Sequence, residues 1–351
     1  MPELAAAIPG VAVFYAMKSN PAQEILRTVA GNGASFEVAS LGELRTLQEL
    51  GIDPTTVLYS NPVKPPEHVA GAHAAGLWRF SVDGPNELVK IAQRAPGAAV
   101  FVRLRVNDRA SAVPLSRKFG ARPDDAHQLM LTARRLGLRP YGVMFHVGSQ
   151  CTDPRAWPAA IAAAGTLMRR LLDDGIELEM LDLGGGFPAR YVEPVPSIRQ
   201  IGLAIAEGLD TLPYRPALLA AEPGRFLVAE AGRLAARVIG REQRDGVNWL
   251  FLEVGAYHGL GEVLPTPGGW RYPMSSSVDG GSLSVPFTVT GPTCDPTDTF
   301  AHEVRLPAAI DVGDVVYLGS AGAYTLAYAT GFNGFPPPTQ VFVDRCDDVV
   351  R

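Results

Sequence analysis

The stretch Val11-Ala12-Val13-Phe14-Tyr15-Ala16-Met17-Lys18-Ser19-Asn20-Pro21 decides how the rest of the chain is interpreted. Seven apolar or aromatic residues precede the lysine, and an apolar run of this length is typical of a buried strand. Asn20-Pro21 marks a turn, which places Lys18 at the carboxyl end of that strand. Burial disfavours the charged form of a lysine, so such a residue is either paired with an acid or used as an amine nucleophile. A strand-end lysine whose ammonium simply reaches solvent is the plainer alternative.

Outward from this stretch, a strand followed by a helix is repeated through roughly the first two thirds of the chain. The apolar runs predict strands over Val11–Lys18, Ser35–Ala39, Thr56–Tyr59, Trp78–Val82, Ala99–Val106, Tyr141–Val147, Leu178–Leu183 and Ala217–Ala221. The helices expected after them are Ala22–Gly31, Leu41–Leu50, Pro66–Ala75, Asn86–Arg94, Ala126–Leu136, Ala156–Asp173, Ser197–Leu209 and Val228–Gly232. Such alternation implies parallel strands with helical crossovers, and this number of units predicts a closed α/β barrel of the (β/α)8 type. A doubly wound open sheet is the alternative.

The pattern changes after about Arg233. Short β-like runs follow at Trp249–Val254, Leu283–Val289, Glu303–Leu306, Asp314–Leu318 and Gln340–Val343, separated by turns rich in glycine and proline. One short helical stretch is expected near Gly322–Ala329, and Pro194–Ser197 and Pro267–Gly281 are expected to be loops. The sequence therefore predicts a barrel domain over residues 1–232 and an all-β domain over residues 233–351.

Composition excludes several classes of protein. The net charge of −5 and the lack of a Lys/Arg run argue against a nucleic-acid partner. Cys151, Cys294 and Cys346 are odd in number and widely spaced, which argues against a disulfide framework or a cysteine zinc site and favours a reducing, cytoplasmic compartment. We find no basic N-terminal segment leading into an apolar core, and no apolar run of membrane-spanning length.

Polar or glycine-rich residues end most of the predicted barrel strands. In order along the chain they are Lys18, Glu37, Asn61, Asp83, Arg105, His146-Val147-Gly148-Ser149, Gly184-Gly185-Gly186-Phe187 and Glu222-Pro223-Gly224-Arg225. In barrels of this kind the chemistry collects at the carboxyl ends of the strands. These residues are therefore the first candidates for a site.

The last of these strand ends resemble a phosphate site. Gly184, Gly185 and Gly186 allow the backbone to approach a ligand and to point N–H groups at an anion, although tight helix–strand packing is the plainer interpretation. Ser149 would add a hydroxyl and Gly224-Arg225 a second turn with a guanidinium. A phosphate pocket opposite a strand-end amine suggests pyridoxal 5′-phosphate, which needs an amine for an imine, a phosphate site and a group at its ring nitrogen.

Taken together, the motifs resemble the fold-type III pyridoxal-phosphate decarboxylases that act on ornithine, lysine, arginine and diaminopimelate. The matching segments, in the order of that family, are Phe14-Tyr15-Ala16-Met17-Lys18, His146-Val147-Gly148-Ser149, Gly184-Gly185-Gly186-Phe187-Pro188, Glu222-Pro223-Gly224-Arg225, Gly291-Pro292-Thr293-Cys294-Asp295 and Gly322-Ala323-Tyr324-Thr325. Cys294-Asp295, Phe119-Gly120 and Phe332-Asn333-Gly334-Phe335 are most similar to the ornithine decarboxylase branch. The resemblance implies the two-domain architecture of alanine racemase, decarboxylation of a basic amino acid, and a place in polyamine biosynthesis.

The resemblance also implies a role for each matched residue. Lys18 would hold the cofactor through an imine, His146 would stack on its ring, and Glu222 would pair with its ring nitrogen. The phosphate would be bound by Ser149, Gly184, Gly185, Gly186, Gly224, Arg225 and Tyr324. Cys294 would protonate the carbanion left by carbon dioxide, which suits a thiol near neutral pH. Asp295 would face the distal amine of the substrate, and both residues would serve the partner's site in a homodimer.

Two features depart from the family pattern. Ornithine decarboxylases carry a second acid at the end of the first strand of the β domain, whereas Glu253-Val254-Gly255-Ala256-Tyr257 places Val254 there. Because this acid is missing, a longer, differently substituted or D-configured diamino acid is as acceptable a substrate as L-ornithine. Tyr257 of the same segment is, with Asp295, a candidate substrate-binding residue. Only seventeen residues precede Lys18, so either the true start lies upstream or the β domain lacks a strand.

Two alternatives remain beside the decarboxylase. An amino-acid racemase would use the same barrel with a tyrosine as its second base, although Gly291-Pro292-Thr293-Cys294-Asp295 favours the decarboxylase. A non-catalytic homologue that binds a regulatory partner would be expected to have lost Lys18, Arg225 or Cys294, and all three are present.

Overall fold

The computed structural model describes residues 1–265, 270–278 and 283–343, so Cys346 lies outside the described residues. The chain divides into two units, and each is described by itself. Unit 1 consists of Met1–Ala189 and Pro194–Leu227, and unit 2 consists of Arg190–Glu193 and the chain from Val228 onward. This division lies close to the boundary expected between residues 232 and 233.

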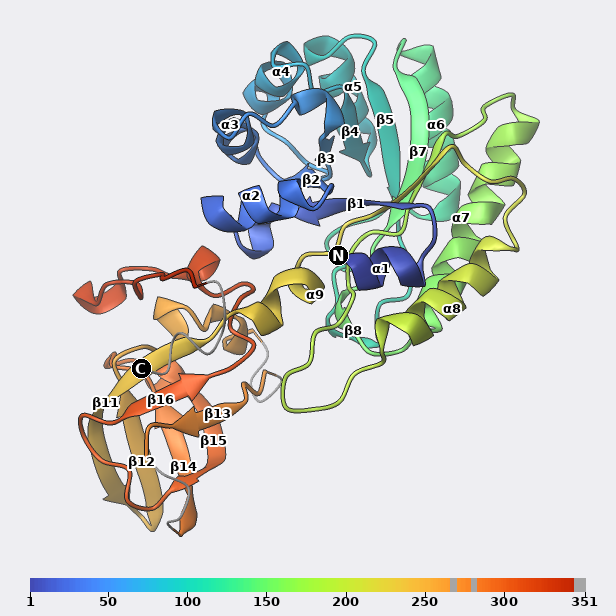
Figure 1. Ribbon diagram of the computed structural model, residues 1–351. Coiled ribbons are helices and arrows are strands. Elements are labelled where there is room, and N and C mark those ends of the chain that lie inside the picture. Colours follow the sequence, from blue (N-terminus) through green and yellow to red (C-terminus); the bar gives the residue numbers. More distant parts are fainter. Residues whose placement is uncertain (266–269, 279–282, 344–351) are drawn as a thin grey trace. The chain divides into compact units, whose positions relative to one another are not determined.

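Unit 1 is built on a closed barrel of eight parallel strands (Figure 1). Around the barrel they are β1 (Val11–Ala16), β10 (Leu218–Ala221), β9 (Met180–Asp182), β7 (Arg139–Phe145), β5 (Ala99–Leu104), β4 (Arg79–Val82), β3 (Leu58–Tyr59) and β2 (Ser35–Val38). The first and last strands pair directly, with Val11 opposite Leu219. The predicted barrel is confirmed, and the open sheet is excluded.

The crossover helices follow the predicted periodicity closely. They are α2 (Gln23–Gly31), α3 (Leu41–Glu49), α4 (Pro66–Ala74), α5 (Pro85–Arg94), α6 (Pro123–Arg135), α7 (Ala156–Asp173), α8 (Ile198–Leu209) and α9 (Arg225–Val228). Local sequence fixes their starts: Ser197 and Gln200 form a capping box at α8, and the Ser40 side chain caps α3. Within the described ranges, no helix combines the length and the apolar character that a membrane span requires.

Apolar side chains from the strands fill the barrel. Phe14, Leu58, Phe101, Met144 and Met180 belong to one buried cluster, to which Tyr141, Ala99 and Ala220 also contribute. This packed interior is mainly apolar, which favours the strand ends as the place for a polar site.

Three elements of unit 1 were not predicted from sequence. Helix α1 (Pro2–Ala7) precedes the barrel, and β6 (Ser111–Val113) pairs antiparallel with β8 (Ser149–Cys151). The helix expected at Val228–Gly232 is wrong, because α9 ends at Val228 and Ala229–Ala231 forms a 3-10 turn. These pieces are too short to produce a periodic signal.

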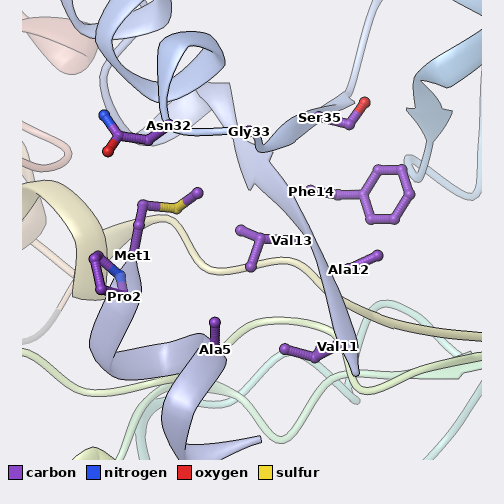
Figure 2. A pocket seen from close by; sticks show the side chains of 10 residues that line it. All are labelled: Met1, Pro2, Ala5, Val11, Ala12, Val13, Phe14, Asn32, Gly33 and Ser35. Atoms are coloured by element: carbon purple, nitrogen blue, oxygen red, sulfur yellow. The ribbon is translucent and has the colours of Figure 1, made fainter. Parts of the chain in front are cut away.

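A pocket of about 290 Å³ lies between α1, the first half of β1 and the turn before β2. Met1 and Ala5 lie on one side of it and Val11 and Val13 on the other (Figure 2). The pocket lies toward the amino end of β1, whereas Lys18 follows the carboxyl end of that strand. No candidate site residue lines it.

Unit 2 contains a mixed six-stranded sheet (Figure 1). The strand order is β13 (Met274–Ser276), β16 (Val315–Leu318), β11 (Leu234–Arg244), β12 (Val247–Leu252), β14 (Ser284–Thr290) and β15 (Thr299–Pro307). Only β12 and β14 run parallel; the other neighbours are antiparallel. The predicted sheet domain is therefore confirmed.

Strand β11 was missed although its signal was present. Its first half alternates buried Ala236 and Val238 with exposed neighbours, but its second half is polar. Asp245 and Gly246 both have positive φ, 52° and 79°, and join β11 to β12. Asp-Gly at such a turn is a strong hairpin signal, so the polar strand is held by its turn and its partner.

Three expectations for unit 2 were wrong in detail. Gln340–Val343 is not a strand: the segment follows Pro336, Pro337 and Pro338, which lack N–H donors, and Val341 is 77% exposed. The segment expected to be helical near Gly322–Ala329 contains only a single 3-10 turn, Leu326–Tyr328. Strand β13 lies within the loop expected at Pro267–Gly281.

Candidate active site

Lys18 lies on a short 3-10 turn, Met17–Ser19, directly after β1. Its Nζ forms an ion pair with the Glu37 carboxylate of β2, the neighbouring strand. Glu37 is 2% exposed, whereas the Lys18 side chain is 43% exposed. The amine is thus held in place by a buried acid and is still reachable from the barrel mouth.

The glycine triplet forms a tight turn after β9. Gly184 and Gly186 have positive φ, 63° and 100°, a region that favours glycine. A Cβ on Gly186 would lie 2.4 Å from the Gly148 carbonyl oxygen, and one on Gly185 would lie 2.9 Å from the His146 ring. The turns after β7 and β9 therefore pack backbone against backbone, as an anion cradle requires.

The turn after β10 completes this group. Arg225 is 4% exposed, and its Nη2 donates to the Ser149 hydroxyl at 3.1 Å. The Ala16 N–H donates to the Pro223 carbonyl at 3.2 Å, which ties the turn to the end of β1. A Cβ on Gly224 would lie 3.0 Å from Ser19, next to Lys18. Residues from four distant parts of the sequence thus meet at one end of the barrel.

Replacing Gly186 by alanine should destabilise unit 1 more than the same change at Gly175. Both positions have positive φ, so each substitution should cost about 1 kcal/mol of backbone strain. Gly175 has open space around it, whereas at Gly186 the overpacking should add about 1–3 kcal/mol. The urea midpoints of the two variants measure the difference, and equal midpoints would show that the close approach at Gly186 does not hold.

His146, the first residue after β7, is held as a neutral ring. Its Nδ1 accepts from the Gly148 N–H at 3.0 Å, which leaves the proton of the neutral ring on Nε2. Burial, and then the charges of Arg103 and Lys18, keep the pKa of His146 well below its usual value. A neutral, flat ring at this position suits stacking on an aromatic ligand.

Glu222 lies among buried polar groups that sequence reasoning missed. Its Oε1 accepts a hydrogen bond from the Ser60 hydroxyl, which follows β3. Burial, then Asp182 and Glu37, raise the pKa of Glu222 well above its usual value. Burial also raises the pKa of Asp182 to about 6. Arg103 on β5 faces Glu222, and its own pKa is lowered, chiefly by burial.

Strand position was the available signal for these residues. Ser60 follows Tyr59 at the end of β3, and Asp182 is the last residue of β9. The other predicted strand-end residues are placed elsewhere: Asp83 accepts from the Gly120 N–H at 2.9 Å, and the Asn61 amide donates to the Ala39 carbonyl at 3.3 Å. Arg105 pairs through its backbone with Ala121.

Tyr257 and Asp295 meet in unit 2. The Tyr257 hydroxyl donates to Asp295 Oδ2 at 2.6 Å, and the Tyr257 ring lies 4.6 Å from that of Phe332. The N–H and hydroxyl of Thr297 donate to Asp295 Oδ1 at 2.9 and 2.8 Å. The hydrogen bond from Tyr257 lowers the pKa of Asp295 most, and the two bonds from Thr297 lower it further. The Asp295 side chain is therefore an ionised hydrogen-bond acceptor. Val254 is buried and brings no second charge.

Asp298 holds the turn that carries Cys294 and was not predicted. Its buried carboxylate accepts from the Ala256 N–H at 2.7 Å and from the Thr293 N–H and hydroxyl at 3.1 and 2.7 Å. It therefore ties the segment before Tyr257 to the segment before Cys294. Cys294 itself is exposed.

Tyr324, the predicted phosphate ligand of unit 2, is half-buried and has a positive φ of 54°. Its ring lies 5.9 Å from that of Tyr328. The structure thus places the predicted site residues in two groups. One is assembled at the barrel mouth of unit 1, and the other lies on the turns of unit 2.

The residues of unit 1 fit the predicted cofactor. The glycine turns, in which a Cβ would collide with neighbouring backbone, lie beside Ser149 and Arg225, and backbone N–H groups of such turns suit a phosphate. The Lys18 amine and the buried Glu222 carboxyl come from neighbouring strands of the same barrel end. An amine, an anion cradle and an acid at the ring nitrogen are the groups that pyridoxal phosphate needs.

Comparison with known protein families places residues 1–229 on the model described as "Pyridoxal-dependent decarboxylase, pyridoxal binding domain". The chain is 36% identical to the lysine/ornithine decarboxylase of Selenomonas ruminantium over 352 residues, which cover 98% of this chain and 86% of that protein. It is 34% identical to the ornithine decarboxylase of Schizosaccharomyces pombe, with coverage of 97% and 79%.

Solved structures of amino-acid decarboxylases also match this chain. A lysine/ornithine decarboxylase from Vibrio vulnificus complexed with cadaverine matches with a TM-score of 0.90 and 34% identity, covering 98% of this chain and 91% of that one. The arginine decarboxylase of Paramecium bursaria Chlorella virus matches with a TM-score of 0.89 and 30% identity, with coverage of 95% and 90%.

Proposed function

Since the chain belongs to the pyridoxal-dependent decarboxylases, we propose that it removes the α-carboxylate of a basic amino acid as carbon dioxide and leaves the amine. The observation that carries this proposal is the barrel mouth. There the Lys18 amine lies at the same end of the barrel as the glycine turns, Ser149 and Arg225.

Each side chain of unit 1 has a task that follows from its surroundings. Lys18, kept reachable by its ion pair with Glu37, would bind the aldehyde carbon of the cofactor. Arg225 and Ser149 would hold its phosphate with the backbone of Gly184–Gly186, and Glu222 would pair with its ring nitrogen. Pyridoxal phosphate, when bound, supplies the electron sink for the negative charge left at Cα.

In unit 2 the proposed tasks concern the substrate and the proton. Cys294 would return a proton to Cα, for which its exposed position on the turn held by Asp298 is suited. Asp295 would bind the distal cation of the substrate, because the Tyr257 and Thr297 hydrogen bonds keep its carboxylate ionised. Tyr324 remains a proposed additional phosphate ligand.

A single acid at the distal site has a consequence for substrate choice. Val254 contributes no charge, so one carboxylate would meet the far end of the substrate. Ornithine, lysine and arginine end in a cation that Asp295 would attract. Diaminopimelate carries a carboxylate there as well, and like charges at close range repel. We therefore expect a substrate with one distal cation and no distal carboxylate.

A screen of carbon dioxide release over L- and D-ornithine, lysine, arginine and diaminopimelate tests the proposal. One basic amino acid should be turned over with kcat/KM at least about tenfold above that of diaminopimelate, which corresponds to about 1.4 kcal/mol. Asp295→Asn should raise KM for the basic amino acid and bring its kcat/KM closer to that of diaminopimelate. Recovery of racemised amino acid without carbon dioxide would instead identify a racemase. Cofactor binding with no turnover of any substrate would point to a non-catalytic homologue.

We also propose a homodimer in which Cys294 and Asp295 serve the partner's cofactor. Support comes from the exposure of Cys294 and Phe332, since both would be covered if the turns of unit 2 face another chain. The cytoplasmic location expected from the cysteine content stays a prediction.

A further inference from the structure

Two buried carboxyl groups lie at the carboxyl ends of neighbouring barrel strands. Asp182 ends β9 with no exposed surface, and Glu222 follows β10 and is 5% exposed. The strands are in register, with Asp182 opposite Ala220, and the Glu222 N–H donates to the Gly184 carbonyl at 2.8 Å. The two carboxyls therefore come from adjacent positions at the same strand ends, where their charges act on each other. Two adjacent buried carboxyls do not both ionise readily, because each disfavours the charge of the other.

One oxygen of this pair lacks a hydrogen-bond donor. Asp182 Oδ1 accepts from the Gly184 N–H at 2.8 Å, whereas Asp182 Oδ2 finds no donor among the described residues. Glu222 Oε1 is already bonded to the Ser60 hydroxyl. Two carboxylates offer each other no hydrogen, but a protonated Glu222 would donate to Asp182 Oδ2. One proton on the pair would therefore satisfy the orphaned oxygen.

The surrounding charges agree with a single shared proton. Glu37 on β2 disfavours ionisation of both acids, while Lys18 favours that of Glu222 and Arg103 that of Asp182. Arg79 on β4 also faces Asp182. With the pKa of Asp182 at about 6 and that of Glu222 well above its usual value, the proton at neutral pH is held mainly by Glu222.

We infer that Asp182 and Glu222 together store one proton, which passes to the ring nitrogen of a pyridine cofactor when that nitrogen docks against Glu222. The inference rests on the proposed function. In this transfer the Glu222 O–H bond breaks and an N–H bond forms. The pair gains one negative charge and the ring one positive charge, so the total charge of the site does not change. In this proposal Asp182 acts on the cofactor through Glu222 and not directly, which makes it a positioning residue.

Proton uptake during binding measures this transfer without any turnover. The probe is 4-deoxypyridoxine 5′-phosphate, which has the ring and the phosphate but no aldehyde, so Lys18 cannot react with it. Calorimetric titration of the cofactor-free chain, in buffers of different ionisation enthalpy, gives the protons taken up per probe bound. The series runs over pH values at which the free probe's ring nitrogen is unprotonated.

Wild-type chain should take up almost no proton for the ring nitrogen, because the pair supplies it. In Asp182→Asn the asparagine amide can donate to Glu222, so Glu222 is ionised beforehand and the buffer should supply about one additional proton. The matched control is Asp173→Asn, the same change at an exposed position on α7, which should behave as wild type. Equal uptake by wild type and Asp182→Asn would overturn the inference. Failure of the wild type to bind the probe would instead overturn the proposed function.

A second variant keeps the test valid if Asp182→Asn does not fold. Ser60→Ala removes the hydrogen bond that favours ionised Glu222, so the pair should keep its proton to higher pH. The pH at which uptake from the buffer begins should rise in Ser60→Ala, the opposite direction from Asp182→Asn. An unchanged onset in Ser60→Ala would also contradict the inference.

Discussion

Lys18→Ala should abolish decarboxylation, with kcat/KM reduced on the order of 10³-fold or more, since it removes the group proposed to bind the cofactor covalently. The loss has a direct structural reason. Among the described residues, Lys18 is the amine placed on the turn after β1, next to Ser19, which packs close to Gly224. The variant should also lose the visible absorbance that borohydride removes from the native protein.

Lys18→Arg is the matched control for this experiment. An arginine keeps a positive charge for the buried Glu37 carboxylate but cannot form an imine. If the ion pair alone matters, Lys18→Arg should retain activity. If the covalent bond matters, both variants should be inactive, while the arginine variant keeps more of the native stability. Native-rate turnover by Lys18→Ala would remove the basis of the proposed function.

Cys294→Ala should reduce kcat by about 10²-fold or more with little change in KM, the effect expected when a general acid is lost. Cys294 stands exposed on the turn that Asp298 fixes, and its Sγ lies 3.8 Å from the Asn333 amide nitrogen. The expected loss is therefore in the rate of the chemical step and not in stability.

Cys294→Ser separates the proton donor from the space that it occupies. Serine preserves the size of the side chain but is a much weaker acid, so it should behave like alanine in kcat. A rise in KM with unchanged kcat in either variant would show that Cys294 binds substrate and does not supply a proton. Urea unfolding of both variants should match that of the wild type.

Much of the fold was predictable because the spacing of apolar residues along the sequence indicates helices and strands. Apolar runs such as Val11–Ala16 and amphipathic helices such as α7 can be identified from a few neighbouring residues. The predictions were wrong where structure depends on a partner. The polar half of β11 is a strand only because β12 pairs with it, and Gln340–Val343 has the right composition but pairs with no strand of the described residues.

The candidate site likewise contains residues that could be predicted from the sequence and residues that could not. Lys18, the glycine triplet and Arg225 follow predicted strands, and parallel strands in a barrel bring their carboxyl ends together. Ser149 and Arg225, both expected at one phosphate site, are joined by a hydrogen bond from Arg225 to Ser149. Asp182 and Ser60 also lie at strand ends, but no motif distinguished them from other polar residues.

The sequence alone predicted a barrel with an amine and glycine-rich turns at one end, because strand order and side-chain type suffice for that prediction. Only the tertiary structure decided which acid holds Lys18 and which groups surround Glu222. The Ser60–Glu222 hydrogen bond joins residues 162 positions apart, and it exists because barrel closure brings the ends of β3 and β10 to the same mouth. Charge and protonation depend on such distances and on burial, which residue spacing along a chain does not encode.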